Sequence, residues 1–542
     1  MKTYNKILAT ALAGVLLVGC NDLDTEPQGS TVTSDQKSEV VSLDPEKAFA
    51  SVSGIPASMN IFGAVLGGDY HNDIGWPGLF LYFDQRGEDM YSVTNGYNKY
   101  QQAQAYTGSV PKSVETYYIW SNCYNLIRSA NSVLATMVPA IDDNATDETT
   151  MLNKFYAAQG YVFHALAYET LAQAYQFNYV GHETAPCVPI ITYDIMDKVA
   201  AEGAPRASVD DVYQVILSDL NKAIEYMTGN PNKPETVLST GAKRFAGVAA
   251  AYGLRARAYL LMGKWSEAAA DAQAAISNFS GAPLSQAEAS VPGFDDINAA
   301  NWMWGIDVAE TDRVVTTGIC NFPSHMGSFN YGYAAAVGAW KWINNQLYAS
   351  ISSSDVRKNW WLNENGKSAG ITDAQAAYLA SCNATPFVQV KFAPYKGEIG
   401  TSVNANDIPL MRVEEMYLIL AEAQAMTAPA TGLQTLVDFV KTYRDSNYNP
   451  QLTTSDDIRN EIWRQRRIEL WGEGFSFFDL LRLNKGVDRR NGGWPATCNY
   501  VIAADDPVLI YPIPESEITT NSQIAESDNN KGGGRPDPVL VN

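Results

Sequence analysis

The chain has 542 residues, of which 46% are hydrophobic, and its formal net charge is -21 at pH 7. This length and composition suffice for a large buried core, and the acidic balance without a basic stripe excludes a nucleic-acid-binding protein. Aromatic residues reach 11%, with 30 Tyr and 12 Trp, an excess that suits ligand-binding faces as well as cores.

The N-terminus has the pattern of a secretory signal. Two lysines precede a mostly apolar run over residues 7–18, and the sequence Leu-Val-Gly-Cys ends this segment at Cys20. The run is too short for a membrane-spanning helix, which needs about 20 apolar residues. Leu-Val-Gly-Cys resembles a lipobox, so we expect residues 1–19 to be a signal peptide and Cys20 to carry a lipid anchor. The alternative is an ordinary signal peptide with a chance cysteine.

Residues 20–43 are expected to form a flexible tether after the lipidated cysteine. They contain few apolar residues and a run rich in Ser and Thr, a composition that does not support a packed core. No later stretch is long and apolar enough to span a bilayer. The sequence therefore predicts a protein that reaches the membrane through its lipid anchor only.

Helical periodicity is clearest over residues 209–227. Apolar side chains recur there at spacings of three and four, and polar side chains fill the opposite face. Ser208 is a favourable N-cap, and Asp211 stands three residues later. This segment therefore predicts an amphipathic helix that begins just after Ser208.

The segment 245–276 predicts two packed helices. A first apolar stripe is followed by Gly263, a residue type that often ends helices, and a second helical pattern starts at Trp265. Residues 258–269 resemble a tetratricopeptide hairpin, in which small alanines let antiparallel helices approach closely. Similar helical patterns cover residues 113–137, 153–175, 412–426, 431–444 and 456–472.

Two stretches, residues 60–110 and 280–405, lack this regularity. They are rich in Gly, Asn, Ser and aromatic residues and have weak periodicity. Loops of such length in a domain are usually functional. The expected fold class is therefore mainly α, with residues 44–542 forming a single domain in which a tetratricopeptide-like helical-hairpin scaffold carries two long irregular loop regions.

Metal-ligand patterns are absent from the sequence. The five cysteines after Cys20 are widely scattered and form no C-x-x-C pair, which argues against zinc and leaves at least one thiol unpaired. The histidines show no metal spacing, and His164 lies among apolar residues of a helix, where a core role is expected. The stretch from Asp69 to Asp73 offers oxygen atoms but lacks the spacing of an EF-hand. We expect no metal and no cofactor.

A dense group of charges near the C-terminus comprises Arg464, Arg466, Arg467, Glu469, Glu473, Asp479 and Arg482. Glu469 and Glu473 are one helical turn apart, so nearby arginines are expected to pair with them in a structural network rather than a catalytic site. Glu88 and Asp89 are adjacent and should point apart in an extended stretch, which argues against an acid–base pair. No G-x-S-x-G, H-E-x-x-H or Walker motif is present, so we do not expect an enzyme.

Four segments carry a resemblance to one known family. They are Trp120–Asn131, Arg412–Gln424, Ile462–Arg482 and Tyr511–Asn521. The second reads Arg-Val-Glu-Glu-Met-Tyr-Leu-Ile-Leu-Ala-Glu-Ala-Gln, the third contains Ile-Glu-Leu-Trp-Gly-Glu-Gly-Phe, and the fourth begins Tyr-Pro-Ile-Pro. With the lipobox, these motifs and their order are similar to those of SusD/RagB-like outer-membrane nutrient-binding lipoproteins of Bacteroidetes.

The resemblance implies a function and a location. Such proteins resemble a lid over a SusC-like TonB-dependent outer-membrane barrel and bind oligosaccharides, or in some branches oligopeptides, for import. The acidic residues after Cys20 resemble the surface-export signal of Bacteroidetes lipoproteins, which suggests the outer face of the outer membrane. A structural lid without its own cargo site and a surface glycosidase remain open as competing functions.

The resemblance also implies that ligand loops come from the two irregular regions. Aromatic faces cover the apolar face of a sugar ring, and neighbouring Asn and Arg side chains bond its hydroxyl groups. The expected ligand-binding residues are Trp76, Arg86, Tyr97, Asn98, Tyr331 and Tyr333. For each of them, packing within the loop is the alternative.

Overall fold

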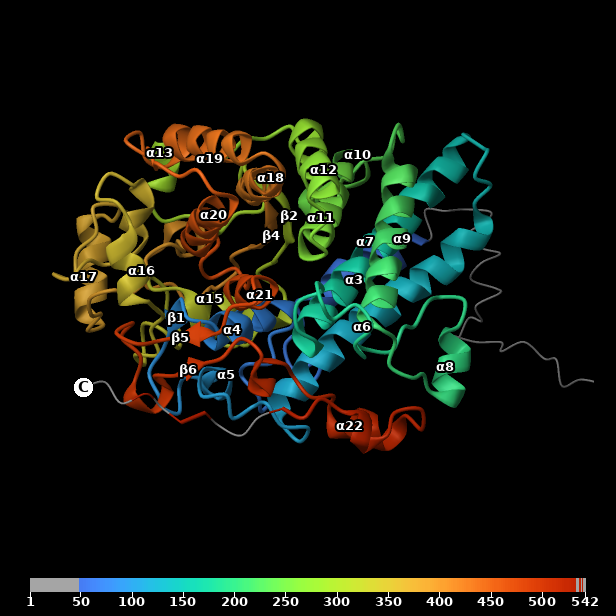
Figure 1. Ribbon diagram of the computed structural model, residues 1–542, viewed down its shortest axis with the longest axis horizontal. Helices are drawn as coiled ribbons and strands as arrows, with labels where there is room; N and C mark the ends of the chain where they lie inside the picture. Colours follow the sequence, from blue (N-terminus) through green and yellow to red (C-terminus); the bar gives the residue numbers. More distant parts are fainter. Residues whose placement is uncertain (1–47, 533–535, 538, 540–542) are drawn as a thin grey trace, which may run out of the picture.

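A computed structural model describes residues 48–532, 536–537 and 539 of the chain. The predicted signal peptide, Cys20 and the predicted tether lie outside these residues. In the described part, helices dominate and the strands are short (Figure 1), which confirms the expected mainly α fold. None of the described helices has the length and apolar character needed to cross a bilayer.

The scaffold is a succession of long helices that pack against one another (Figure 1). They are α6 (Val114–Met137), α7 (Glu148–Tyr175), α9 (Val209–Met227), α11 (Val248–Leu261), α12 (Trp265–Asn278), α18 (Val413–Thr427), α19 (Pro429–Tyr443) and α20 (Ser455–Glu469). Packed pairs include α6 with α7, α7 with α9, α11 with α12, α12 with α18, and α18 with α19 and α20. Each of these helices overlaps a segment for which the sequence predicts one.

Local signals set the helix boundaries. At the start of α9, the hydroxyl oxygen of Ser208 accepts a hydrogen bond from the Asp211 N–H at 3.1 Å, and the Asp211 carboxylate accepts one from the Ser208 N–H at 3.3 Å. Between α11 and α12, Gly263 has a φ of +69°, a conformation that strains residues with a Cβ. Both predicted boundaries are confirmed.

Glycines let neighbouring helices approach closely. A Cβ added to Gly160 of α7 would lie 2.9 Å from Cγ of Leu134 on α6. A Cβ added to Gly432 of α19 would lie 2.3 Å from the backbone nitrogen of Ala425 on α18. Because interiors are close-packed, a side chain at either position would push the two helices apart.

Shorter elements complete the described chain. The helices are α3 (Phe49–Ser58), α4 (Trp76–Arg86), α5 (Gln101–Gln104), α8 (Met196–Glu202), α10 (Pro234–Val237), α13 (Gln286–Ala289), α14 (Arg313–Thr316), α15 (Phe322–Met326), α16 (Asn345–Ser350), α17 (Asp373–Ser381), α21 (Ser476–Arg482) and α22 (Glu515–Thr520). The strands are β1 (Met90–Tyr91), β2 (Trp302–Ile306), β3 (Trp342–Ile343), β4 (Ile408–Arg412), β5 (Val487–Asp488) and β6 (Val501–Ile502). They form antiparallel pairs β1–β3, β2–β4 and β5–β6.

The pairing of β1 with β3 joins the two irregular regions. Met90 lies opposite Ile343, and Tyr91 lies opposite Trp342. The rings of Tyr91 and Trp342 stack with their centroids 5.5 Å apart. The loops that follow β1 and precede β3 are therefore held near each other, although about 250 residues separate them in the chain.

The charge cluster near the C-terminus is a structural network, as expected, but the arginines that pair with Glu469 and Glu473 come from outside the cluster. Arg412 lies 3.1 Å from Glu469 and 2.8 Å from Glu473, and Arg444 lies 2.8 Å from Glu469. All four side chains are buried. Burial alone would raise the pKa of Glu469, but Arg444, Arg412 and Arg357 hold it well below its usual value. These charges tie β4 to the end of α20 and to the loop after α19.

The prediction that Glu88 and Asp89 point apart is wrong. Arg467 lies 3.0 Å from Glu88 and 2.5 Å from Asp89, so both carboxylates face the same guanidinium. The backbone bends over residues 87–89 instead of extending, and the alternation expected of a strand does not apply.

Candidate functional site

A hollow of about 670 Å³ lies beside α4 and α5, in the first irregular region. Its polar lining includes Asp69, His71, Asn72, Thr94, Asn98, Lys99, Gln101 and Gln102. Amide and hydroxyl groups donate and accept hydrogen bonds, the Lys99 ammonium donates, and the Asp69 carboxylate accepts. The hollow can therefore satisfy a ligand with many hydroxyl groups.

Three tyrosines of the irregular regions are exposed. Tyr70 is 43% exposed, Tyr97 is 51% exposed and Tyr331 is 53% exposed. Other aromatic side chains of these regions, such as Tyr82 and Tyr100, are buried in the core. The exposed rings are therefore not needed to fill the interior and are free to stack on a ligand.

Tyr333 connects the two irregular regions at the hollow. His71 Nδ1 lies 2.5 Å from Tyr333 Oη, and the Tyr333 ring stacks on His325 with centroids 4.6 Å apart. His325 Nε2 lies 2.9 Å from the carbonyl oxygen of His71, so this nitrogen carries a proton. Burial lowers the pKa of His325 to about 3, which keeps the ring neutral. Lys99 Nζ lies 5.7 Å from the centre of the Tyr333 ring.

Asn98 supports the loop that carries Tyr97. Its side-chain amide donates to one backbone group of its own loop at 3.1 Å and accepts from another at 3.3 Å. Burial raises the pKa of Tyr333 to about 12, and the nearby Tyr97 hydroxyl adds to the increase. The structure therefore brings Tyr97, Asn98 and Tyr333 to one place, and Tyr331 lies two residues from Tyr333. Asn98 and Tyr333 are themselves only 4% and 5% exposed, but Asn98 lines the hollow and Tyr333 contacts His71 in its wall.

The other two predicted ligand residues are buried and line no part of the hollow, so their assignment is corrected. Trp76 is 3% exposed and Arg86 is fully buried. Arg86 donates to the Ser109 hydroxyl at 2.7 Å and lies 3.6 Å from Glu115. Its guanidinium also lies 4.1 Å from the ring centre of Tyr511. Both residues belong to α4, which is a core helix rather than an exposed loop, so Arg86 holds the fold together.

Tyr70 was among the aromatic candidates of the first irregular region, whereas four other lining residues were missed by the sequence predictions: His71, Lys99, Gln101 and Gln102. The stretch from Asp69 to Asp73 was considered only as a source of oxygen ligands for a metal, so His71 was not predicted to be a ligand-binding residue. Gln101 and Gln102 lie in α5, which spans only four residues and is too short for a periodic pattern.

The described residues contain no cluster that could hold a metal ion. In the part of the chain that the structure describes, no three His, Cys, Asp or Glu side chains converge on one point. Asp73 is buried, and its carboxylate accepts hydrogen bonds from the N–H groups of Val65 at 2.8 Å and Leu66 at 2.5 Å. It therefore organises the loop before α4. The five cysteines of the described part are all free thiols.

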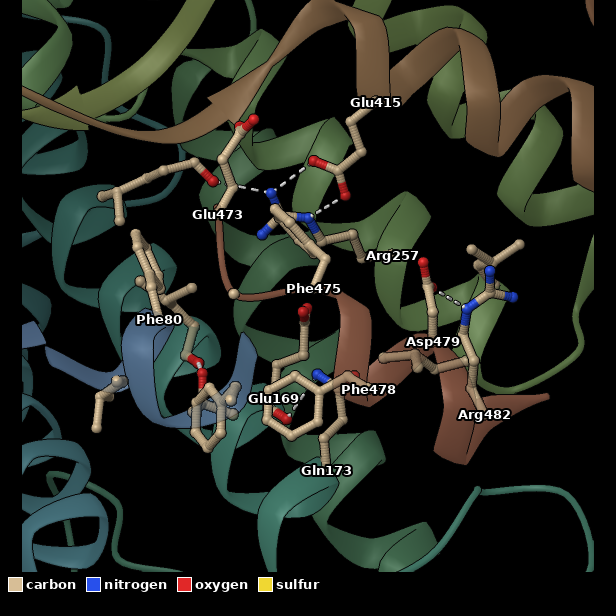
Figure 2. Close-up of a pocket in the computed structure, with 18 of the residues that line it drawn as sticks. Phe80, Glu169, Gln173, Arg257, Glu415, Glu473, Phe475, Phe478, Asp479 and Arg482 are labelled. Atoms are coloured by element: carbon tan, nitrogen blue, oxygen red, sulfur yellow. Dashed lines mark hydrogen bonds and ion pairs between the residues drawn. The ribbon is translucent and has the colours of Figure 1, made fainter. Parts of the chain in front are cut away.

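A smaller cavity of about 70 Å³ lies deeper, between α4, α7, α11 and α21 (Figure 2). Arg257 donates two hydrogen bonds of 2.6 Å to Glu415, and Arg482 lies 2.6 Å from Asp479 (Figure 2). Burial raises the pKa of Glu169 at the opposite wall to about 8. A space of this size holds a few water molecules. In its wall, Arg257 pairs with Glu415 and Arg482 pairs with Asp479. Among the described residues, Oε2 of Glu169 and Nη1 of Arg466 have no hydrogen-bond partner, and both are suited to bind such water. It is not a site for a sugar.

Comparison of the sequence with known proteins finds relatives along most of its length. A family model described as "SusD family" matches residues 340–532, and one described as "Starch-binding associating with outer membrane" matches residues 76–260. SusD-like protein P2 of Formosa agariphila is 24% identical, and the match covers 97% of this chain and 99% of that protein. SusD-like protein P38 of the same organism is 29% identical over 137 residues, which are 22% of this chain and 27% of that protein.

Solved structures share the fold. A SusD-like carbohydrate binding protein from Bacteroides vulgatus has a TM-score of 0.70 and 22% identity, covering 90% of this chain and 98% of its own. Surface glycan-binding protein A from Bacteroides fluxus has a TM-score of 0.62 and 19% identity, covering 90% of this chain and 99% of its own. These similarities confirm the SusD-like architecture. The two family models and the full-length relative make this chain similar to SusD/RagB-like proteins along most of its length.

Proposed function

We propose that this protein is a surface lipoprotein that captures oligosaccharides and delivers them to a SusC-like TonB-dependent outer-membrane transporter. The observation that carries the proposal is the polar hollow of about 670 Å³ with exposed tyrosines near it. The names of similar proteins support it, because one is described as carbohydrate binding and another as glycan-binding.

The ligand is held by stacking and hydrogen bonds, without bond breaking. Tyr97 and Tyr331 offer their ring faces to the apolar side of sugar rings. Asn98 and Lys99 in the hollow bond the hydroxyl groups. Tyr333 is held by His71 and His325, so it forms a rigid edge that needs little reorganisation when the ligand binds.

The anchor and partner follow from the same proposal. Cys20 carries the lipid, residues 20–43 act as the tether, and the family description places starch binding in association with the outer membrane. A tethered binder raises the effective concentration of the ligand at the pore of the transporter. A ligand that contacts both protein and barrel favours the closed complex, because its affinity for that state is higher.

Calorimetric titration of the soluble form that lacks residues 1–20 tests the proposal. The panel contains oligosaccharides of α-1,4-glucan, β-1,3-glucan and β-1,4-xylan, together with mixed oligopeptides. We expect heat with one glycan class and no release of shorter sugars on prolonged incubation. Binding of peptides only would establish the peptide-import alternative. Absence of binding to both glycans and peptides would favour a structural lid. Hydrolysis of the bound glycan would instead identify a glycosidase.

A further inference from the structure

A second groove, of about 700 Å³, lies along α6. One wall is α6 itself, and the facing wall comes from α8 and α22, which lie towards the lower right of Figure 1. No residue of α8 is buried, and its Met196 and Val199 line the groove. The groove is therefore an open channel of about the same volume as the hollow described above.

One face of α6 lines both spaces. Val114 lines the hollow, whereas Tyr117, Ser121, Tyr124 and Arg128 line the groove. These residues are three or four positions apart, so they form one stripe along the helix. At about 1.5 Å per residue, the stripe is about 21 Å long. The hollow and the groove thus follow each other along a single helix.

The loop between residues 64 and 70 separates the two spaces. Ala64 and Val65 line the groove, and Asp69 and Tyr70 line the hollow. The Asp73 carboxylate accepts hydrogen bonds from three successive N–H groups of this loop, at 2.8, 2.5 and 3.3 Å. These hydrogen bonds make the loop a rigid boundary between the two spaces. The loop carries the exposed Tyr70.

The groove has the chemistry of a saccharide site. Tyr117 is 38% exposed, and aromatic side chains alternate with Ser121 and Arg128 along the stripe. Asn131 also lines the groove. Its amide donates to the Ile191 carbonyl at 2.8 Å, so Asn131 fixes the wall of the groove. Ser121 and the exposed Arg128 supply the groups that a sugar hydroxyl can reach.

We propose that the groove between α6, α8 and α22 is a second subsite for the same oligosaccharide, which extends from the hollow across the loop at residues 64–70. This inference rests on the proposed function and adds the length of the ligand to it. Short oligosaccharides occupy the hollow only. Longer ones also cover Tyr117 and bind more tightly.

The experiment compares trisaccharides and nonasaccharides of the three glycans in the panel by calorimetric titration. The variants are Tyr117→Ala and Arg128→Ala in the groove, Tyr97→Ala beside the hollow, and Val180→Ala as an exposed control that lines neither space. We expect each groove variant to weaken the nonasaccharide about tenfold, the loss typical of one stacked or charge-assisted contact, and to leave the trisaccharide unchanged. Tyr97→Ala should weaken both lengths.

Hydroxyl-radical labelling provides a second measurement. The nonasaccharide should protect Met196 in the groove from oxidation, and the trisaccharide should not. Equal affinity of the groove variants and wild type for the nonasaccharide, with no protection of Met196, would overturn the second subsite while leaving the hollow intact. If wild type binds no glycan of either length, the proposed function itself fails.

Discussion

Replacing Tyr97 or Tyr331 with alanine tests whether the exposed rings bind the ligand. A tyrosine side chain carries about 200 Å² of surface. Since Tyr97 is 51% and Tyr331 is 53% exposed, about 100 Å² of each side chain is accessible to a ligand. A sugar that stacks on one face covers about half of this area, which at about 25 cal/mol per Å² amounts to about 1.2 kcal/mol.

The expected loss for each single variant is therefore about eightfold in Kd. The measurement is a calorimetric titration with the glycan that binds wild type most tightly. Because both rings are exposed, thermal unfolding of the variants should match wild type within about 0.5 kcal/mol. Val180→Ala, another exposed apolar truncation at 55% exposure, should change neither affinity nor stability.

The double variant shows whether the two rings act on one ligand. Independent contacts would multiply the losses, whereas rings that stack on neighbouring sugars of one chain should couple by about 0.5 kcal/mol or more. If both single variants and the double variant bind with the affinity of wild type, the reasoning that places the ligand on these tyrosines is refuted.

Two further predictions concern buried charges. Lys341→Met should raise the free energy of unfolding at pH 7, because burial lowers the pKa of Lys341 to about 7 and, within the described residues, its amino group donates only to a carbonyl at 2.8 Å. In the unfolded chain, the lysine amino group stays protonated up to about pH 10. The free energy of unfolding of wild type should therefore rise by up to about 1.4 kcal/mol per pH unit between pH 7 and 10. Urea unfolding of Lys341→Met should lack this pH dependence. The matched change Lys391→Met should instead destabilise, because Lys391 lies 2.7 Å from the buried Glu473. Arg86→Ala should cost about 3–5 kcal/mol by leaving Glu115 buried without its partner; loss of glycan affinity with unchanged stability would return Arg86 to the ligand site.

The helical scaffold could be read from local patterns of the sequence. The N-cap at Ser208, the break at Gly263 and the apolar stripes that define α9, α11 and α12 are local features, and local features are readable from spacing alone. The structural role of the charge cluster around Glu469 was also predictable, because buried charges have to pair. Its partners were not, because Arg357, Arg412 and Arg444 lie far from Glu469 in the chain. The exposed aromatic loops were indicated by composition and by the resemblance to the family.

Which loop residues face solvent depends on how the whole chain packs, and local patterns did not reveal it. Residues 76–86 form α4, which is buried on nearly all sides. A helix of this kind lacks the polar face that makes a helix recognisable in a sequence. Trp76 and Arg86 therefore could not be distinguished from exposed ligand residues. The meeting of His71 with Tyr333 spans 262 positions and depends on the pairing of β1 with β3. Contacts at such separation follow from how the whole chain packs, and no local pattern encodes them.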